Sequence, residues 1–253
     1  FVACGTSLHA AKTARKWFED ICEIPCYIDF ASEYRYRNPI VEDHTLFVTI
    51  SQSGETADTL AALEYARAEK YVGIVTICNV PTSTMARNAD WKIFTNAGPE
   101  IGVASTKAFT TQLAALLMLA LSIAKSQDKN AKKRKQATQE LRETPALVDQ
   151  AFSLKENISQ ITQNISTKHN ALFLGRGMYF SIAQEGALKL KEISYIHAEA
   201  YPAGELKHGP LALVDEQIPV IALAPEDSLV EKLLSNLEEV KARGGTLFVF
   251  GNA

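Results

Sequence analysis

The sequence lacks features on which two classes of protein depend. Its 26 basic residues are outnumbered by 29 acidic ones, for a net charge of −3, so no basic excess is available to neutralise the phosphates of a nucleic acid. Its longest apolar run, residues 113–121, is shorter than the roughly 20 residues that cross a bilayer. We therefore expect neither a nucleic-acid nor a membrane partner, and we interpret the run as the core helix of a soluble, cytoplasmic protein.

Cysteine is scarce, and an initiator methionine is missing. Cys22 and Cys26 lie close together in the sequence, but the other two cysteines, Cys4 and Cys78, do not form the second pair that a zinc site needs. Reduced thiols without a bound metal are the expected state of all four. Because Phe1 begins in the middle of an apolar, strand-like run, we expect the chain to be cut from a longer protein.

Apolar runs alternate with helical patterns and predict an α/β fold. With 253 residues, of which 47% are hydrophobic, the chain can bury one large core or two smaller ones. The alternation implies right-handed crossovers and a parallel sheet that is covered on both faces. In the first half of the chain we predict strands at residues 1–4, 26–30, 46–50, 71–77 and 90–94, and helices at residues 8–21, 57–70 and around 113–121.

The second half of the chain repeats the first. Residues 172–177 repeat the strand and glycine turn of residues 1–7, and residues 203–205 echo residues 31–33. A further apolar run at residues 219–224 is expected to be a strand. Two copies of one αβα unit are the economical interpretation.

A polar segment separates the two copies. We place the first domain at residues 1–126, a helical connector at residues 127–168, and the second domain at residues 169–253, which we expect to be incomplete at its C-terminal end. The basic run at residues 128–136 invites a nucleic-acid interpretation, but mixed charges at helical spacing more often mark a solvated helix. Pro145 is expected to start a new helix within the connector.

Residues 51–56 stand at a strand-loop-helix junction and carry an unusual number of hydrogen-bonding groups. They include three hydroxyl side chains and one amide, placed where a helix presents unpaired N–H groups and the positive end of its dipole. Gly54 allows the backbone to approach an oxyanion closely. Two hypotheses follow, an anion site and a plain N-terminal cap. A cap needs only one hydroxyl, which favours the anion site. The polar side chains are Ser51, Gln52, Ser53 and Thr56.

Two other polar loops are expected at the same edge of the sheet. Thr6 and Ser7 follow the first predicted strand, and residues 98–106 follow the fifth. In open α/β sheets ligands bind outside the carboxyl ends of the strands, so these loops can converge with residues 51–56 on one pocket. In the second copy, residues 224–227 have no hydroxyl and two acidic groups. Since acidic groups repel phosphate, we predict one phosphate site per chain.

The second copy offers candidate acid–base groups instead. A helix that is predicted to start near Ser181 carries Glu185, Lys189 and Glu192 on one face. Spacing alone favours an ordinary ladder of ion pairs. His208 is followed by Gly-Pro, which ends any helix and sets the imidazole at a turn, where it can act as an acid or base near neutral pH. A carboxylate and an imidazole beside a phosphate pocket would suit proton transfer next to a carbonyl.

Four segments together resemble a known enzyme family. They are residues 51–56, 96–107, 185–192 and 205–210, and they are similar to the isomerase part of the glucosamine-6-phosphate synthase family. Its members are glutamine:fructose-6-phosphate aminotransferases built on paired sugar isomerase (SIS) domains. The resemblance covers essentially the whole chain. It implies two tandem flavodoxin-like αβα sandwich domains with parallel sheets, and ketose–aldose isomerisation that leads from fructose 6-phosphate to glucosamine 6-phosphate.

The resemblance also implies roles for individual residues. Glu192 would be the base that moves a proton between C1 and C2 of the sugar. His208 would open the hexose ring, reaching the pocket from the neighbouring subunit of a homodimer. Lys189 and Glu185 would give electrostatic and hydrogen-bonding support, and neither a metal nor an organic cofactor is implied. The sugar phosphate would be held by Ser51, Gln52, Ser53 and Thr56, and the rest of the pocket would be lined by Thr6, Ser7 and Val103.

The chain departs from that family at both ends. It has no glutaminase domain, which in the family precedes the isomerase part on the same polypeptide, and no C-terminal tail with the Schiff-base lysine. We therefore expect it to bind the sugar phosphate but not to release ammonia. Two alternatives remain, a non-catalytic phosphosugar sensor and a stand-alone aldose–ketose isomerase. A sensor would not need Glu192 together with His208, and a simple isomerase would not be expected to carry residues 205–210 in this form.

Overall fold

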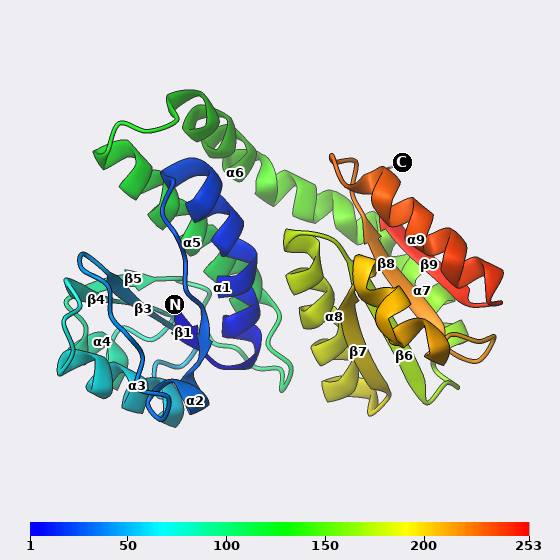
Figure 1. The fold of residues 1–253 in the computed structure, drawn as a ribbon, viewed down its shortest axis with the longest axis horizontal. Coiled ribbons are helices and arrows are strands. Elements are labelled where there is room, and N and C mark those ends of the chain that lie inside the picture. The colour runs from blue at the N-terminus through cyan, green and yellow to red at the C-terminus, as the bar shows by residue number, and fades with distance from the viewer. Residues whose placement is uncertain (253) are drawn as a thin grey trace. The chain divides into compact units, whose positions relative to one another are not determined.

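The computed structural model describes residues 1–252, which form two compact units. The first unit spans residues 1–138, and the second comprises the described residues from 139 onward. Each unit has its own parallel sheet with helices packed against it (Figure 1). The predicted α/β fold with two tandem domains is confirmed.

The first sheet has the strand order β2-β1-β3-β4-β5, and every pair is parallel. The two long central strands pair from Leu46↔Gly73 to Ser51↔Cys78 and are almost entirely buried, as expected for a sheet that is covered on both faces. The predicted strand at residues 26–30 is wrong in length, because only its last two residues join the sheet. The strands are β1 (Val2–Ala3), β2 (Asp29–Phe30), β3 (Leu46–Ser51), β4 (Gly73–Cys78) and β5 (Trp91–Phe94).

Helices cover both faces of this sheet. Val48 and Ile50 of β3 pack on α1 and α5, whereas Phe47 packs on α2, α3 and α4, which is the alternation that a strand requires. One predicted boundary is wrong, because α1 begins at Gly5 and places Thr6 and Ser7 in its first turn. The helices are α1 (Gly5–Trp17), continued by η1 (Phe18–Cys22), α2 (Ala31–Tyr34), α3 (Ala57–Arg67), α4 (Thr84–Asn88) and α5 (Lys107–Ser126).

Helix α5 is long and apolar enough to cross a membrane, by length and composition alone. It lies beside α1 (Figure 1), and its buried residues Phe109, Ala115 and Leu116 belong to the core of the first unit. A single helix of this kind is weak evidence for a membrane span, since core helices pass the same test. The packing is that of the core helix that the sequence predicts.

The second sheet has the strand order β7-β6-β8-β9, again with every pair parallel. This order matches β2-β1-β3-β4 of the first unit. In each unit a helical element begins directly after the edge strand, at Ala31 after Phe30 and at Ala203 after Pro202. The predicted internal repeat is therefore confirmed. The strands are β6 (Asn170–Gly175), β7 (His197–Pro202), β8 (Pro219–Ala224) and β9 (Thr246–Gly251).

Helices also cover both faces of the second sheet. Leu233 and Leu237 of α9 pack with Val220 of β8, and Ala187 of α8 packs with Ile221 on the other face. Helix α8 begins before the predicted start at Ser181. The helical elements are α8 (Met178–Ser194), η3 (Ala203–His208), η4 (Pro210–Leu213) and α9 (Val230–Ala242).

Helices α6 (Ala131–Ala151) and α7 (Lys155–Ile165), with η2 (Phe152–Leu154) between them, form the predicted helical segment. The expectation that Pro145 starts a new helix is wrong, because α6 continues through it. A proline inside a helix leaves the carbonyl four residues earlier without its N–H partner. No residue of α6 is buried, so water can bond that carbonyl and the helix persists.

Candidate functional site

The loop between β3 and α3 is folded by its own hydroxyl groups. The side chain of Ser51 is almost completely buried, with 2% exposed. Its Oγ accepts a hydrogen bond from the N–H of Gly54 at 3.0 Å and bonds with Oγ1 of Thr56 at 2.9 Å. The Oγ of Ser53 accepts from the N–H of Glu55 at 3.1 Å. These bonds hold the loop in one compact turn over the start of α3.

Gly54 is required by the geometry of this turn. It has φ +66°, and a Cβ there would lie 2.2 Å from Oγ of Ser83. The Gly54 carbonyl accepts from the N–H of Met85 at 3.1 Å, and the Glu55 carboxylate accepts from the N–H of Thr84 at 2.7 Å. The Thr84 N–H thereby lowers the pKa of Glu55. The loop is thus anchored on the first turn of α4.

The position of the Thr56 side chain favours one of the two hypotheses for the hydroxyl cluster. Thr56 occupies the N-cap position of α3, but its side chain makes no capping hydrogen bond to that helix. Its hydroxyl is bonded to Ser51 instead. The first N–H groups of α3 are therefore not satisfied by a side-chain cap, and together with the helix dipole they favour an anion at this end.

The loop after β1 lies beside the start of α3. The Sγ of Cys4 is 3.9 Å from Oγ1 of Thr59, which is in the first turn of α3. Ser7 is in the first turn of α1, and its Oγ accepts a hydrogen bond from Nε2 of Gln112 at 3.0 Å. The structure therefore brings Thr6 and Ser7 to the same edge of the sheet as the Ser51 loop.

Asn79, which follows β4, joins two of the loops and was missed by the sequence analysis. Its N–H donates to the carbonyl of Gln52 at 3.1 Å. Its Oδ1 accepts from the N–H of Ala97 at 2.8 Å and from Oγ1 of Thr95 at 3.1 Å, and its Nδ2 donates to the carbonyl of Gly98 at 2.7 Å. The sequence does contain a feature that indicates Asn79, because it is a polar residue at the carboxyl end of a parallel strand.

The structure does not bring Val103 to the other candidate residues. Its side chain is fully exposed. The loop that carries it is anchored further along, where Nζ of Lys107 donates to the carbonyl of Pro99 at 2.6 Å and the N–H of Ala108 donates to Glu100 at 3.2 Å. A role for Val103 in the pocket stays a prediction.

Glu185, Lys189 and Glu192 share one face of α8, as the spacing predicts. The Nζ of Lys189 lies 3.5 Å from Oε1 of Glu185 and 2.5 Å from Oε2 of Glu192. Glu185 is only 5% exposed, whereas the side chain of Glu192 is about one-third exposed, at 34%. A buried carboxylate at one end and an accessible one at the other distinguish this cluster from a ladder on a solvated surface.

His208 ends η3, and the chain turns there as predicted. Gly209 has φ +135°, and Pro210 begins η4. The neighbouring Lys207 is held by α9 through an ion pair of 2.8 Å with Glu239. His208 itself is exposed, and within residues 1–252 no hydrogen bond or ion pair joins it to Glu192.

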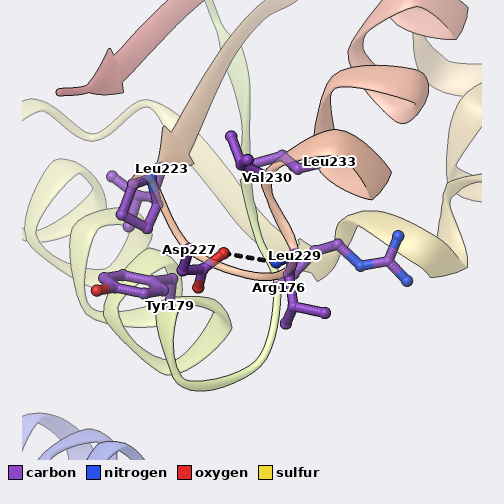
Figure 2. A pocket seen from close by; sticks show the side chains of 8 residues that line it. Arg176, Tyr179, Leu223, Asp227, Leu229, Val230 and Leu233 are labelled. Carbon is purple, nitrogen blue, oxygen red and sulfur yellow. Dashed lines mark hydrogen bonds between the residues drawn. The ribbon is translucent and has the colours of Figure 1, made fainter. Parts of the chain in front are cut away.

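The edge of the second sheet has a small pocket at the position that the Ser51 loop occupies in the first (Figure 2). Oδ1 of Asp227 accepts from the N–H of Leu229 at 2.8 Å. The guanidinium of Arg176 points away from the pocket and donates to Oδ1 of Asn236 at 3.0 Å. Burial, aided by the charge of Asp227, raises the pKa of Tyr179. The lining residues are Arg176, Tyr179, Leu223, Pro225, Asp227, Leu229, Val230 and Leu233.

The four cysteines are free thiols. Cys22 and Cys78 are buried, whereas Cys4 and Cys26 are partly buried. Burial raises the pKa of Cys26 to about 11. In the part of the chain that the structure describes, no three His, Cys, Asp or Glu side chains are grouped as metal ligands would be.

The SIS domain model matches residues 1–122 and 164–252. The chain belongs to the SIS domain family. Its two matched segments lie in the two units of the fold, and the residues between them are mainly those of α5, α6 and α7. The resemblance to paired SIS domains is therefore confirmed.

The relatives of this chain show which members of the SIS domain family it is similar to. It is 57% identical over 249 residues to a glutamine–fructose-6-phosphate aminotransferase (isomerizing) of Legionella pneumophila (strain Lens), and 57% identical over 252 residues to one of Pseudomonas aeruginosa. The alignments cover 98% and 99% of this chain but only 40% and 41% of those proteins. The chain thus spans two-fifths of the length of these relatives.

Solved structures agree with the sequence relatives. The C-terminal domain of glucosamine-fructose-6-phosphate aminotransferase from Francisella tularensis has a TM-score of 0.97 at 55% identity, over 99% of this chain and 71% of that one. A glucosamine-6-phosphate deaminase from Thermotoga maritima has a TM-score of 0.83 at 25% identity, over 100% of this chain and 75% of that one. The chain is thus similar to the isomerase part that the four sequence segments predict.

Proposed function

We propose that this chain is the sugar-isomerase part of a glutamine–fructose-6-phosphate aminotransferase. Its ligand is fructose 6-phosphate, which the complete enzyme converts with glutamine to glucosamine 6-phosphate. The observation that carries the proposal is the bond between Ser51 and Thr56, which draws the capping hydroxyl away from α3. The names of the relatives support the same ligand class.

The phosphate group binds at the Ser51 loop. A dianion there neutralises the positive end of the α3 dipole and bonds to its first N–H groups. Ser51, Ser53 and Thr56 already bond to one another or to the loop backbone, so they are held in place before the ligand arrives. The side chain of Gln52 supplies an amide, and the backbone carbonyl of Gln52 accepts a hydrogen bond from the N–H of Asn79. Little conformational entropy is lost on binding, because the loop is organised in advance.

Proton transfer is assigned to Glu192. Its carboxylate takes a proton from C1 of open-chain fructose 6-phosphate. The C1–H electron pair forms a C1–C2 double bond while the π pair of the C2 carbonyl moves to its oxygen, which takes up a proton. The C1 hydroxyl of this enediol then loses its proton as the C1 carbonyl forms, and Glu192 returns a proton to C2, which gives the aldose. The balance needs no external oxidant or reductant. Lys189 lies 2.5 Å from Glu192 and also pairs with buried Glu185. It can thereby orient the base and stabilise negative charge that develops on the substrate oxygen.

His208 opens the hexose ring by proton transfer to the ring oxygen. An exposed imidazole at a fixed turn suits a group that acts across a subunit interface, so we propose a homodimer in which each His208 serves the partner's site. The glutaminase domain of the same polypeptide would deliver ammonia, and the protein would work in the cytoplasm. Neither a metal nor an organic cofactor has a step in this scheme.

Two measurements separate this proposal from its alternatives. Calorimetric titration of the chain with fructose 6-phosphate tests binding, and absence of binding contradicts the proposed ligand. Exchange of the C1 proton with heavy water, followed by NMR on the full-length protein, tests proton transfer. A sensor binds without exchange, whereas a stand-alone isomerase exchanges and forms glucose 6-phosphate without any requirement for glutamine. The aminotransferase forms glucosamine 6-phosphate only when glutamine is present.

A further inference from the structure

Gln112 is a polar residue where the fold gives no structural reason for one. It lies in α5, and all other buried residues of this helix are apolar. Its side chain is 1% exposed. Buried amides are normally fully hydrogen-bonded, since an unpaired polar atom loses its water without compensation.

The hydrogen bonds of Gln112 are incomplete. Its Nε2 donates to Oγ of Ser7 at 3.0 Å. Its Oε1 is buried and has no hydrogen-bond partner within residues 1–252. An apolar side chain of the same volume would pack at this place without leaving an acceptor unpaired. Stability therefore does not explain the amide, and local violations of this kind are expected at functional sites.

Gln112 determines how the hydroxyl of Ser7 is hydrogen-bonded. A serine hydroxyl can donate one hydrogen bond and accept two. Ser7 Oγ accepts from Gln112, and in the described part of the chain it makes no other hydrogen bond. Its proton is therefore directed away from the amide and remains unused. Ser7 is in the first turn of α1, next to the loop that touches the start of α3 through Cys4 and Thr59.

We infer that Gln112 is a positioning residue that fixes Ser7 as a hydrogen-bond donor to an oxygen of the sugar phosphate. The inference rests on the proposed function and deepens it. Gln112 does not touch the ligand. By donating to Ser7, it prevents the serine from using its proton on the amide and presents that proton to an acceptor, such as a phosphate or sugar oxygen.

Three variants test this inference by calorimetric titration with fructose 6-phosphate and by thermal unfolding. Gln112→Met keeps an unbranched side chain of similar volume but removes the donor. We expect it to weaken binding about 3- to 10-fold, as for the loss of one hydrogen bond, while the Tm is unchanged or higher. Ser7→Ala should weaken binding by at least as much. The double variant should be no weaker than Ser7→Ala alone, because the two residues act through one hydroxyl.

Gln112→Glu provides a second readout, which a purely structural role would not change. An ionised carboxylate accepts the proton of Ser7 and removes it from the ligand, so binding at pH 8 should weaken by more than in Gln112→Met. A protonated carboxylic acid can donate again, and burial favours this form. The affinity ratio of the unaltered chain to Gln112→Glu should therefore approach one as the pH falls.

Leu116→Met is the matched control, since Leu116 is equally buried on α5 and is not bonded to Ser7. It should leave the affinity unchanged. The inference is overturned if Gln112→Met lowers the Tm without weakening binding, or if the losses of Gln112→Met and Ser7→Ala multiply. If Gln112→Met does not fold, the pH dependence of Gln112→Glu decides the question. Failure of the unaltered chain to bind the sugar overturns the proposed function itself, whereas binding that depends on Ser51 but ignores Gln112 overturns only this inference.

Discussion

Oγ of Ser51 and Oγ1 of Thr56 lie 2.9 Å apart, and this bond withdraws the Thr56 side chain from the helix that it would otherwise cap. An ordinary N-cap hydroxyl stabilises a helix by bonding to its first N–H groups. The Thr56 side chain does not cap α3. The first N–H groups of α3 can therefore donate to another acceptor.

Ser51, Ser53 and Thr56 should carry most of the binding energy of the phosphate. Loss of a hydrogen bond to a charged group costs about 1.5 to 3 kcal/mol, so Ser53→Ala should weaken fructose 6-phosphate binding about tenfold or more. Calorimetric titration measures this directly. Ser235→Ala is a suitable control, since Ser235 is an exposed serine of the other unit. Unchanged affinity in a Ser51→Ala/Ser53→Ala double variant would contradict the assignment of this loop.

Gly54→Ala should destabilise the protein far more than Gly98→Ala. Both glycines have positive φ, +66° and +68°, but only at Gly54 would a Cβ collide with a neighbour, 2.2 Å from Ser83. We expect Gly98→Ala to lower the free energy of unfolding by about 1 kcal/mol, from backbone strain alone. Gly54→Ala should lower it by about 2 to 4 kcal/mol, from strain plus overpacking. Chemical denaturation of the two variants gives the comparison. Equal losses would mean that the Ser83 contact is not tight.

Each chain should bind one phosphate. The pocket at the edge of the second sheet contains the carboxylate of Asp227, and the Arg176 guanidinium points away from it. Titration should give a stoichiometry of one per chain, and Ser51→Ala/Ser53→Ala should remove that site without revealing another. Crystals soaked with a sugar phosphate should show density at the Ser51 loop alone. Equal density at residues 224–227 would show that the two repeats are functionally equivalent.

Glu192→Gln should separate binding from chemistry in the full-length protein. The amide keeps the shape of the side chain but has no basicity, so affinity for the hexose phosphate should persist. Turnover should fall by the roughly 10² to 10⁴ that is typical of acid–base groups. His208→Ala should slow ring opening instead, and an open-chain analogue should partly rescue it.

A mixture of these two inactive variants tests the shared site. In a two-fold dimer, a heterodimer of Glu192→Gln and His208→Ala rebuilds one site with both groups intact. Activity should return once subunits have exchanged. If confirmed exchange restores no activity, His208 acts within its own chain or has no catalytic role.

Cys26 should reduce stability at alkaline pH. Burial raises its pKa to about 11 in the folded protein, above the value of roughly 8.5 for a free thiol. Between these values the unfolded chain has lost the thiol proton while the folded protein retains it, so the free energy of unfolding falls as the pH rises. Below the lower value there is no effect. Denaturation from pH 7 to pH 11 should show a smaller decline for Cys26→Ala, and identical curves would contradict the burial of this thiol.

Much of the site could be predicted from local pattern. The hydroxyl-rich loop follows a short buried strand and precedes a helix, so its place at a strand-helix junction depends only on neighbouring residues. The face shared by Glu185, Lys189 and Glu192 follows from helical periodicity alone. The repeat was visible because β6 and β1 begin the two copies with the same strand and glycine turn.

Contacts between residues far apart in sequence could not be predicted in this way. Gln112 and Ser7 are 105 positions apart, and nothing in either neighbourhood indicates that one bonds the other. Asn79 bonds both the Gln52 carbonyl and the loop after β5 because parallel pairing brings the ends of β3 and β4 together. Such bonds depend on strand order, which local pattern does not specify.

The sequence by itself determined the fold class, the repeat and the chemical types at each loop, because the alternation of apolar and polar residues is set by local helix and strand geometry. Tertiary structure decided which of those groups are free to act. Thr56 could have capped α3, but its hydroxyl bonds to Ser51 instead. Pro145 could have started a helix, but α6 continues through it because no residue of α6 is buried and water can bond the carbonyl that the proline leaves without a partner. A polar group takes the partner that packing brings within reach, and packing is settled only when the whole unit has folded.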